Sequence, residues 1–531
     1  MEQFLAKHAD VVIGSLSGFD RLVFRGTLRA LCHRFGVKNY LWAMQVLLKD
    51  FAGHAEALTG QLREASEALA RRTARPIRYL ASSATSKEQI AREIARADGI
   101  EQGLICVLTA VEPCLSCEIV RDHATRRLQL MPRYRKCLHL YHYQVHPVFG
   151  FMHARIQTWF PFAIQICLNG REWLARAMNT ERLRYVQRDN CFTWLERPER
   201  AQQLMDQQVQ AAWPDLLSGI ARSLNPEHEA MFRPFPIDYY WSTYQSEWAT
   251  DILFRDAASL ARLYPKLVHH GLTTFLSPDV MRFLGRNIPP TGKLPPRLQA
   301  EVTSDMRRRP EGVRIKHRLG QNSIKMYDKA VPTGLDPREG SVLRIETTIN
   351  DASGFKVFRT PQGKPEAPMS WHGMRKGIAD LHRRAEVSQA ANNRYLRALA
   401  SVDDTTPLGE LATRLCQPAR RNGRQVRSLN PYAPADASLL DAISRAEFTL
   451  NGFRNRDLRP LLFPNSAASK HEQRRQAAAV TRRLALLRAH RLINKVPGTH
   501  RYLLSRHGRI VVTALISARN ANAQELTKLA A

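Results

Sequence analysis

Alternating apolar and polar positions in the middle of the chain predict three β-strands. They cover residues 313–319, 323–329 and 342–349, and side chains at every second position of a strand point to the same face. In an antiparallel meander, these strands present one polar and mainly basic face, which we expect to bind phosphates. The residues at these alternate positions are Arg314, Lys316, Arg318, Lys325, Tyr327, Lys329, Arg344, Glu346 and Thr348.

The first 232 residues are predicted to form a mixed α/β domain. Apolar spacing in this segment changes repeatedly between the periods of a helix and of a strand. The pattern predicts, in order, an apolar stretch and turn at 11–18, helical structure over 40–72, a buried strand at 104–111, paired strands at 151–159 and 161–168, and a helix from Arg171.

Proline-rich and basic stretches indicate where this domain and the next one end. A proline-punctuated joint at 233–238 leads into a central α+β domain, 239–415, which we expect to begin with an aromatic helix and to carry the basic antiparallel sheet. Residues 372–402 return to a helical pattern, and 416–435 form a basic, exposed linker. The fold class is therefore α+β, in several domains.

The last segment, 436–531, has the most specific pattern. Three helices are predicted at 454–463, 470–478 and 479–490, followed by two short strands around Pro497 and Gly498. This order of elements resembles the winged helix-turn-helix family. The resemblance implies a nucleic-acid-binding domain whose third helix enters the major groove of DNA, with the wing beside it.

Charge favours the same interpretation of this segment. Residues 450–510 contain fourteen arginines and lysines against two acidic residues. Those expected to contact nucleic acid from the helices and the wing are Arg474, Arg475, Thr481, Arg482, Arg483, Arg488, Lys495, His500 and Arg501. A protein-binding winged helix with a solvated basic face is the alternative.

The whole chain shares this excess of positive charge. Its 531 residues contain 79 Lys and Arg against 48 Asp and Glu, a net charge of +31. Such a charge indicates a polyanionic partner, nucleic acid before an acidic membrane surface. The longest apolar run, 103–111, is far shorter than the roughly 20 residues of a spanning helix. We therefore expect no membrane partner. The eight cysteines suggest no disulfide framework, so we expect a cytoplasmic protein.

Catalytic candidates lie on the basic strands. Tyr327-Asp328-Lys329 followed by Leu343-Arg-Ile-Glu346 resembles a segment of rolling-circle replication initiators. That family nicks single-stranded DNA with a tyrosine and a metal held by a His-hydrophobic-His pair, which this chain lacks. The resemblance implies Tyr327 as nucleophile, or Asp328 and Glu346 as ligands of Mg²⁺ or Mn²⁺, with Lys325 and Lys329 neutralising phosphate. A non-catalytic basic face is the alternative.

Three further groups have a weaker pattern. Cys114, Cys117, Cys137 and His139 are candidate zinc ligands, and His139, His142 and His146 are a second candidate metal group; buried structural residues are the alternative for both. Asp20 is a candidate first acid of a ribonuclease-H-like two-metal site, although no partner carboxylates are evident at strand ends. Phosphate-loop and dinucleotide-binding glycine motifs are absent from the sequence.

Motifs spread along the chain give a final resemblance, to a large group of uncharacterised bacterial proteins. They lie at 18–28, 148–162, 322–329, 343–350 and 451–458. The resemblance implies a mobile or multicopy genetic element. We expect a DNA-binding protein of such an element, with or without nicking or strand transfer. The alternative is a non-catalytic transcriptional regulator, or the protein of a ribonucleoprotein with structured RNA. Charge does not distinguish DNA from RNA.

Overall fold

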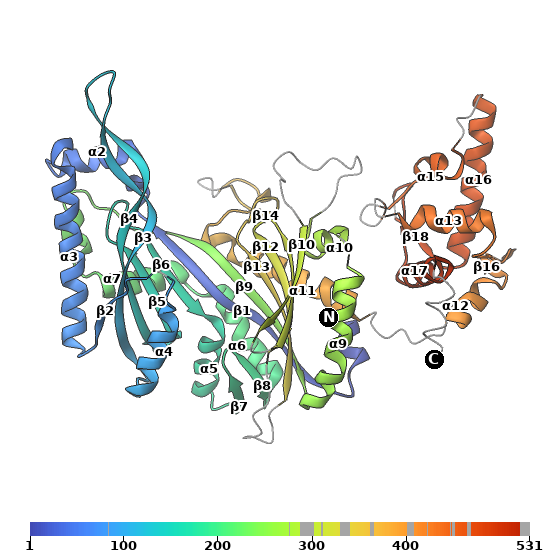
Figure 1. Cartoon of the computed structure of the whole chain (residues 1–531), viewed down its shortest axis with the longest axis horizontal. Helices are drawn as coiled ribbons and strands as arrows, with labels where there is room; N and C mark the ends of the chain where they lie inside the picture. The colour runs from blue at the N-terminus through green and yellow to red at the C-terminus, as the bar shows by residue number, and fades with distance from the viewer. Residues whose placement is uncertain are drawn as a thin grey trace. The chain divides into compact units, whose positions relative to one another are not determined.

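The computed structural model of the chain forms two compact units. It describes residues 1–82, 84–275, 277–286, 302–309, 312–329, 340–361, 366–400, 408–421, 423–445, 448, 452–464, 469–496 and 498–520. Unit 1 comprises 1–272 and 304–397, and unit 2 comprises 273–303 and 398–531. Both α-helices and β-strands are present, with a large mixed sheet in unit 1 (Figure 1).

The described residues of unit 1 build an eleven-stranded sheet. β2 and β3 pair in parallel, and the pairs from β3 through to β11 are antiparallel. In spatial order the strands are β10 (Val302–Arg309), β11 (Gly312–Leu319), β12 (Asn322–Asp328), β13 (Ser341–Ile349), β9 (Tyr240–Phe254), β1 (Val12–Thr27), β6 (Ile164–Asn169), β5 (Gly150–Gln157), β4 (Leu128–His146), β3 (Gly103–Arg121) and β2 (Ile77–Tyr79).

The predicted basic meander is confirmed as β11, β12 and β13. Its register places Lys325 between Lys316 and Glu346, and Tyr327 between Arg314 and Arg344. The strand pair predicted at 151–159 and 161–168 is likewise confirmed as β5 and β6. Alternation of side chains thus located these strands to within a few residues.

The aromatic segment expected to be a helix is instead β9, and this expectation was wrong. Trp, Tyr and Thr favour strands because their bulky side chains pack well on a pleated surface. Trp241 and Trp248 are buried in the core, and β9 pairs along its length with β1. The sheet therefore runs without a break across the domain joint expected at 233–238.

The turn expected at 11–18 is also wrong, because β1 continues through it. Its glycines serve close packing instead: a Cβ at Gly14 would lie 3.1 Å from Pro198, and one at Gly18 would lie 2.3 Å from Met205. Both contacts come from α6 (Pro198–Gln210). Glycine therefore lets this helix lie directly on the strand.

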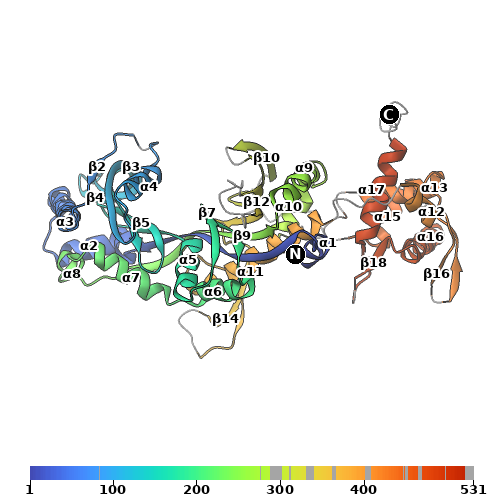
Figure 2. The same ribbon diagram turned by 90° about the horizontal axis from the view of Figure 1, so that it is seen from below.

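Helices cover both faces of the sheet. Phe24 and Trp248 on one face join a core cluster with residues of α3 and α11, whereas Tyr141 and Ala110 on the other face pack on α4. Figures 1 and 2 show α3 and α4 on opposite sides of the strands β2 to β5. The helices of unit 1 are α1 (Glu2–Lys7), α2 (Arg34–Ala43), α3 (Phe51–Arg72), α4 (Lys87–Ala97), α5 (Gly170–Thr180), α6, α7 (Trp213–Leu224), α8 (His228–Phe232), α9 (Ala257–Thr273) and α11 (Leu381–Leu399).

Two short hairpins complete unit 1. One pairs β7 (Tyr185–Arg188) with β8 (Cys191–Leu195), and the other pairs β14 (Lys356–Arg359) with β15 (Ser370–Gly373). The turn of the β7–β8 hairpin carries Asn190, which reaches the centre of the large sheet. Among the described residues of both units, no helix has the length and apolar character needed to cross a membrane.

Unit 2 is mainly helical, with its own core of leucine, valine and phenylalanine side chains. Phe453 forms an isolated bridge with Tyr502, which adds a third chain segment to the β18–β19 pair. The elements are α10 (Ser277–Phe283), α12 (Leu408–Leu415), β16 (Ala419–Arg421), β17 (Arg424–Val426), α13 (Pro434–Ser444), α15 (Asn455–Leu462), α16 (Lys470–Ala489), β18 (Ile493–Lys495), β19 (Tyr502–Leu504) and α17 (Arg506–Asn520).

Two expectations for this part of the chain differ from the structure. The helices expected at 470–478 and 479–490 are one helix, α16, because the alanines at the expected break are strong helix formers. The segment 416–435, expected to be an exposed linker, contains the β16–β17 hairpin. Leu429 is completely buried in the core of unit 2, and Arg427 forms an ion pair with Asp436 at 2.6 Å.

Candidate metal centre

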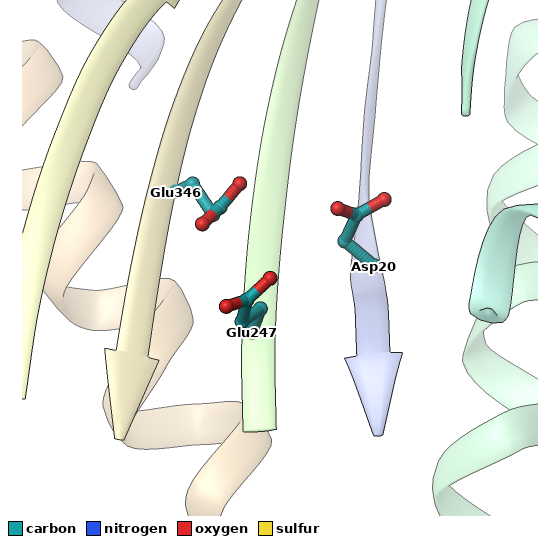
Figure 3. A group of neighbouring side chains, drawn as sticks. All are labelled: Asp20, Glu247 and Glu346. Carbon is teal, nitrogen blue, oxygen red and sulfur yellow. The ribbon is translucent and has the colours of Figure 1, made fainter. Parts of the chain in front are cut away.

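Three carboxylates converge on one face of the large sheet. Asp20 of β1, Glu247 of β9 and Glu346 of β13 come from three adjacent strands, and one oxygen of each lies within 4.8 Å of the others (Figure 3). Within the described ranges, this is the single set of three His, Cys, Asp or Glu side chains that approach so closely. Carboxylate oxygens are the ligands that Mg²⁺ and Mn²⁺ prefer.

Strand register explains why these side chains meet. The β1–β9 pairing shifts between Phe19 and Arg21, so Asp20 lies at a bulge. Bulges re-aim side chains and are frequent beside active sites. On β9, Glu247 pairs with Thr348 of β13, two pairs along from the pair that contains Glu346. The three carboxylates therefore converge although their residues lie at different positions along the three strands.

A network of buried ion pairs and hydrogen bonds holds the side chain of Asp20. Arg344 is completely buried and binds Asp251 through two hydrogen bonds of 2.6 and 2.8 Å, while its third nitrogen lies 3.2 Å from Asp20 Oδ1. Arg171, also completely buried, forms an ion pair with Asp251 at 3.0 Å. Asn190 donates its amide to both oxygens of Asp20, at 2.8 and 2.9 Å. Asp20 is thereby held rigidly.

Different partners hold the two glutamates. Lys325 contacts Glu346 directly, and its ammonium nitrogen lies 3.9 Å from Glu247 Oε1. Tyr327 donates its hydroxyl to Glu346 Oε2 at 2.6 Å, and Gln245 donates its amide to Glu247 Oε1 at 2.9 Å. Each carboxylate of the group thus has at least one donor that fixes its orientation.

Burial and neighbouring charges shift the pKa values of the three carboxyls in different directions. Burial raises the pKa of Asp20, and Glu346 and Asp251 add to the rise against the opposing charge of Arg344. Burial and the charge of Glu346 also raise the pKa of Glu247. Burial acts to raise the pKa of Glu346 as well, but Lys325 and Tyr327 outweigh it and hold that pKa low. The charged forms of Asp20 and Glu247 are therefore disfavoured, mainly by burial, and a divalent cation would favour them.

A row of cations lies beside the carboxylates on the same face. Arg314 and Lys316 of β11 stand opposite Tyr327 and Lys325, and all four are partly exposed, as is Arg318 further along the strand. Burial and the neighbouring positive charges, Lys325 first, lower the pKa of Lys316. Mutual repulsion within this row is relieved by an anion such as a phosphate.

The structure brings some of the sequence-predicted catalytic residues together and separates others. Tyr327, Lys325 and Glu346 are in direct contact. Asp328 occupies the next position of β12, so its side chain points toward the opposite face and lies outside the carboxylate group. Lys329 lies 3.8 Å from Asp189 at the β7–β8 turn. Arg344, expected to bind phosphate, has no exposed surface and belongs to the buried network.

Sequence reasoning missed Glu247 and found no partners for Asp20. Both omissions have one cause, because interpreting 239–248 as a helix removed the strand that joins β1 to β13. The signal that was available is the number of Tyr, Trp and Thr residues between 239 and 250, because these residue types favour strands.

The cysteine and histidine candidates do not gather into a metal site. No three of Cys114, Cys117, Cys137 and His139 meet within the distance that defines the carboxylate group, in the part of the chain that the structure describes. Burial lowers the pKa of both His139 and His142 to about 4. The ring of His142 contacts Ser66 of α3 at 3.0 Å, so it is a buried neutral residue.

The predicted nucleic-acid contacts of unit 2 are mostly on its surface. Thr481 and Arg482 are exposed on α16, and Leu484 and Leu487 are buried in the core. Arg483 stacks on Phe463 at 5.3 Å, and Arg475 forms an ion pair with Glu472 at 3.0 Å. Exposed residues are Arg474, Arg475, Thr481, Arg482, Lys495 and His500, and partly buried ones are Arg483, Arg488 and Arg501.

No family model, no curated protein and no solved structure matches this chain. The interpretation of the site rests on its own geometry.

Proposed function

We propose that this protein binds nucleic acid and catalyses metal-dependent phosphodiester cleavage or strand transfer at Asp20, Glu247 and Glu346. The observation that carries the proposal is the meeting of three carboxylates within 4.8 Å on a sheet face lined by cations. Carboxylates of this number and spacing suit Mg²⁺ or Mn²⁺, which supply a Lewis acid and an activated water for phosphoryl chemistry.

The neighbouring residues fit the handling of a phosphodiester. Arg314, Lys316 and Arg318 extend away from the carboxylates along β11, where they neutralise the phosphates of a strand lying across the face. Lys325, between this row and the carboxylates, is placed to contact the phosphate being cleaved. Tyr327 donates to Glu346 and orients it.

Tyr327 is less suited to the role of nucleophile. Burial and the adjacent charge of Glu346 raise the pKa of its hydroxyl well above the usual value. A nucleophilic hydroxyl needs a lowered pKa or a base free to take its proton, and Glu346 is already bound by Lys325. Hydrolysis or transfer by a non-covalent route is therefore the chemistry we propose.

A DNA-binding role for unit 2 is the second part of the proposal. The order α13, Phe453, α15, α16, β18, β19 corresponds to that of a winged helix-turn-helix, with α16 as the recognition helix. Exposed Thr481 and Arg482 lie on α16, and Lys495 and His500 lie on or beside the β18–β19 hairpin. A protein of a mobile or replicating element, which must bind and cut its own DNA, would use both parts.

One observation favours a non-catalytic alternative. Lys325 already contacts Glu346 and approaches Glu247, so the carboxylates have an internal cation. A network of this kind also serves as a buried structural ion cluster. The protein would then be a nucleic-acid-binding regulator, or the protein of a ribonucleoprotein with structured RNA.

Cleavage and metal binding together test the proposal. The full-length protein would be incubated with labelled single-stranded DNA, duplex DNA and structured RNA, in Mg²⁺, Mn²⁺ or EDTA. We expect cleavage that needs the metal and is lost in D20N, E247Q and E346Q. The matched control is D206N, an acid of α6 on the same unit. Unchanged cleavage in the three site variants, or no Mn²⁺ binding by calorimetry, would refute the catalytic role and favour the alternative.

A further inference from the structure

The large sheet has a long two-stranded extension that contributes no residue to the metal centre. β4 pairs with β5 no further than His139, and β3 pairs with β2 no further than Thr109. Beyond these points β3 and β4 pair only with each other and continue as a hairpin up to Arg121 and Leu128. We name residues 113–136 the β3–β4 arm; Figure 1 shows it projecting past α2.

The arm is anchored firmly at its base. Trp159 donates its indole N–H to the carbonyl of Cys117 at 3.2 Å, and Gln157 donates to the carbonyl of Leu115 at 3.2 Å. The guanidinium of Arg135 stacks 4.3 Å above the Trp159 ring. Cys114, Cys117 and Leu130 are buried in the main core. An isolated hairpin is only marginally stable in water, so these contacts are what hold the arm in place.

The tip of the arm is a turn that several hydrogen bonds hold in one conformation. The Asp122 carboxylate accepts the backbone N–H groups of Ala124 and Thr125, both at 2.9 Å, and the amide of Gln129 at 2.6 Å. The backbone N–H of Asp122 donates to the carbonyl of Arg127 at 2.9 Å. This turn displays Arg126 and Arg127, both exposed, at the end of the arm.

Charge on the arm is strongly positive and is not neutralised internally. The arm has six arginines and lysines against two carboxylates. Both carboxylates are engaged, Asp122 in the turn and Glu118 with Arg133 at 3.4 Å. Among the described residues, four exposed cations of the arm form no ion pair: Arg121, Arg126, Arg127 and Lys136.

An exposed apolar pair accompanies the cations. Tyr134 is 80% exposed and pairs across the arm with Leu115, which is 49% exposed. An exposed aromatic ring among arginines and lysines can contact sugars or the methyl groups of thymines while the cations contact phosphates. A partner that is both anionic and partly apolar matches this surface.

We infer that the β3–β4 arm inserts into the major groove of duplex DNA. That groove, about 12 Å wide, admits a two-stranded β-ribbon, and cations at the tip and along the edges then reach phosphates. The major groove of double-stranded RNA is too narrow to be read by side chains. The inference rests on the proposed function for one point, that the partner is a nucleic acid, and it does not depend on the metal centre.

Salt-dependent binding tests the inference on the full-length protein in EDTA, where no metal chemistry occurs. The probe is a labelled 30-base-pair DNA duplex of mixed sequence. We expect R121A/R126A/R127A to bind at least tenfold more weakly than the unchanged protein at 150 mM salt. Its plot of log affinity against log salt should be less steep by roughly two to three, since each lost phosphate contact reduces the slope by about 0.9.

The matched control removes the same charge elsewhere. Arg63, Arg71 and Arg72 are exposed on α3 of the same unit, so R63A/R71A/R72A should keep the steeper slope. A second variant, Y134S, should weaken binding without changing the slope, because an apolar contact releases no counterions. Circular dichroism melts confirm that each variant is folded.

Three results would overturn the inference. The first is equal binding by the arm variant and its control. The second is an equal loss of affinity for double-stranded RNA of the same length. The third is a change in sedimentation from dimer to monomer with unchanged DNA binding, which would make the arm a contact between two copies of the chain. Failure of the cleavage assay, with arm-dependent binding retained, removes the catalytic proposal and leaves this one standing.

Discussion

Lys325 contacts Glu346 across the β12–β13 pair while its ammonium nitrogen lies 3.9 Å from Glu247. One side chain therefore touches two of the three converging carboxylates. In a protein without metal, this ammonium offsets part of the charge of Glu346 and Glu247. A metal ion bound at the same carboxylates would take over that role and leave Lys325 for a phosphate.

Replacing this lysine should separate the two roles. K325M leaves buried Glu346 and partly buried Glu247 without this cation, so we expect it to lower the free energy of unfolding by about 3 kcal/mol in EDTA. Mn²⁺ should restore much of this loss, because the ion then meets no internal competitor. Urea unfolding with and without Mn²⁺ measures both effects, and K316M, one strand away, is the control. A loss that Mn²⁺ does not restore would favour a purely structural cluster.

Replacing Glu247 should have the opposite effect on the stability of the metal-free protein. Its raised pKa means that the charged form is disfavoured in the folded protein. We expect E247Q to leave the metal-free protein as stable or to stabilise it by about 1 kcal/mol, since one pKa unit corresponds to about 1.4 kcal/mol. The increase in melting temperature that Mn²⁺ causes should disappear. Thermal melts in EDTA and Mn²⁺ check this, with Q245E as a variant that adds charge beside the group.

The raised pKa values of Asp20 and Glu247 also predict a pH dependence. Below the ordinary pKa of a carboxyl group, both residues are protonated in the folded and unfolded chains. As pH rises through that range, the unfolded chain loses protons first, so the contribution of these groups to metal-free stability falls until their folded pKa values are passed. Metal binding needs the ionised forms, so Mn²⁺ affinity should rise over the same window.

Two measurements check this dependence. Urea unfolding in EDTA, from mildly acidic to mildly alkaline pH, should show the wild-type protein losing stability relative to D20N/E247Q as pH rises. Calorimetry in buffers of different ionisation enthalpy should detect protons released when Mn²⁺ binds. A stability difference that stays constant with pH would contradict the raised pKa values of Asp20 and Glu247.

Tyr327 distinguishes a positioning residue from a nucleophile. Y327F removes the hydrogen bond to Glu346 but keeps the ring, so we expect cleavage to slow by about tenfold or less, the share of one orienting hydrogen bond. The pH profile should shift because Glu346 loses its donor. Y264F removes a hydroxyl that bonds to Val313 on the other face, and it should cleave normally. Complete loss of cleavage, or a covalent DNA adduct in the wild-type protein, would identify Tyr327 as the nucleophile.

Arg482 tests the role of unit 2. It is exposed on α16, where a recognition helix would carry its contacts. We expect R482A to weaken binding of a cognate duplex by about 1–3 kcal/mol if it contacts a base, or to reduce the salt slope by about 1 if it contacts a phosphate. R414A, on α12 of the same unit, is the control. Binding equal to that of R414A would argue against α16 as the recognition helix.

Local patterns predicted much of the sheet and part of the site. Strict alternation identified β11, β12 and β13, and it correctly predicted that Lys325, Tyr327 and Glu346 share one face. The aromatic segment that forms β9 was expected to be a helix, and so the strand pair that carries Glu247 was not recognised. Whether Trp and Tyr enter a helix or a strand depends on what they pack against, which is a property of the fold.

The sequence by itself determined the charge of this protein, the period of its strands and the residues that each strand presents to one face. Only the tertiary structure decided which strands are neighbours. Asp20 and Glu247 lie more than two hundred residues apart in the chain, yet β1 and β9 pair along their whole length. Alternation specifies a strand's two faces without specifying its partner, because pairing depends on long-range packing and register. The three carboxylates converge only because β1, β9 and β13 are neighbours in this register.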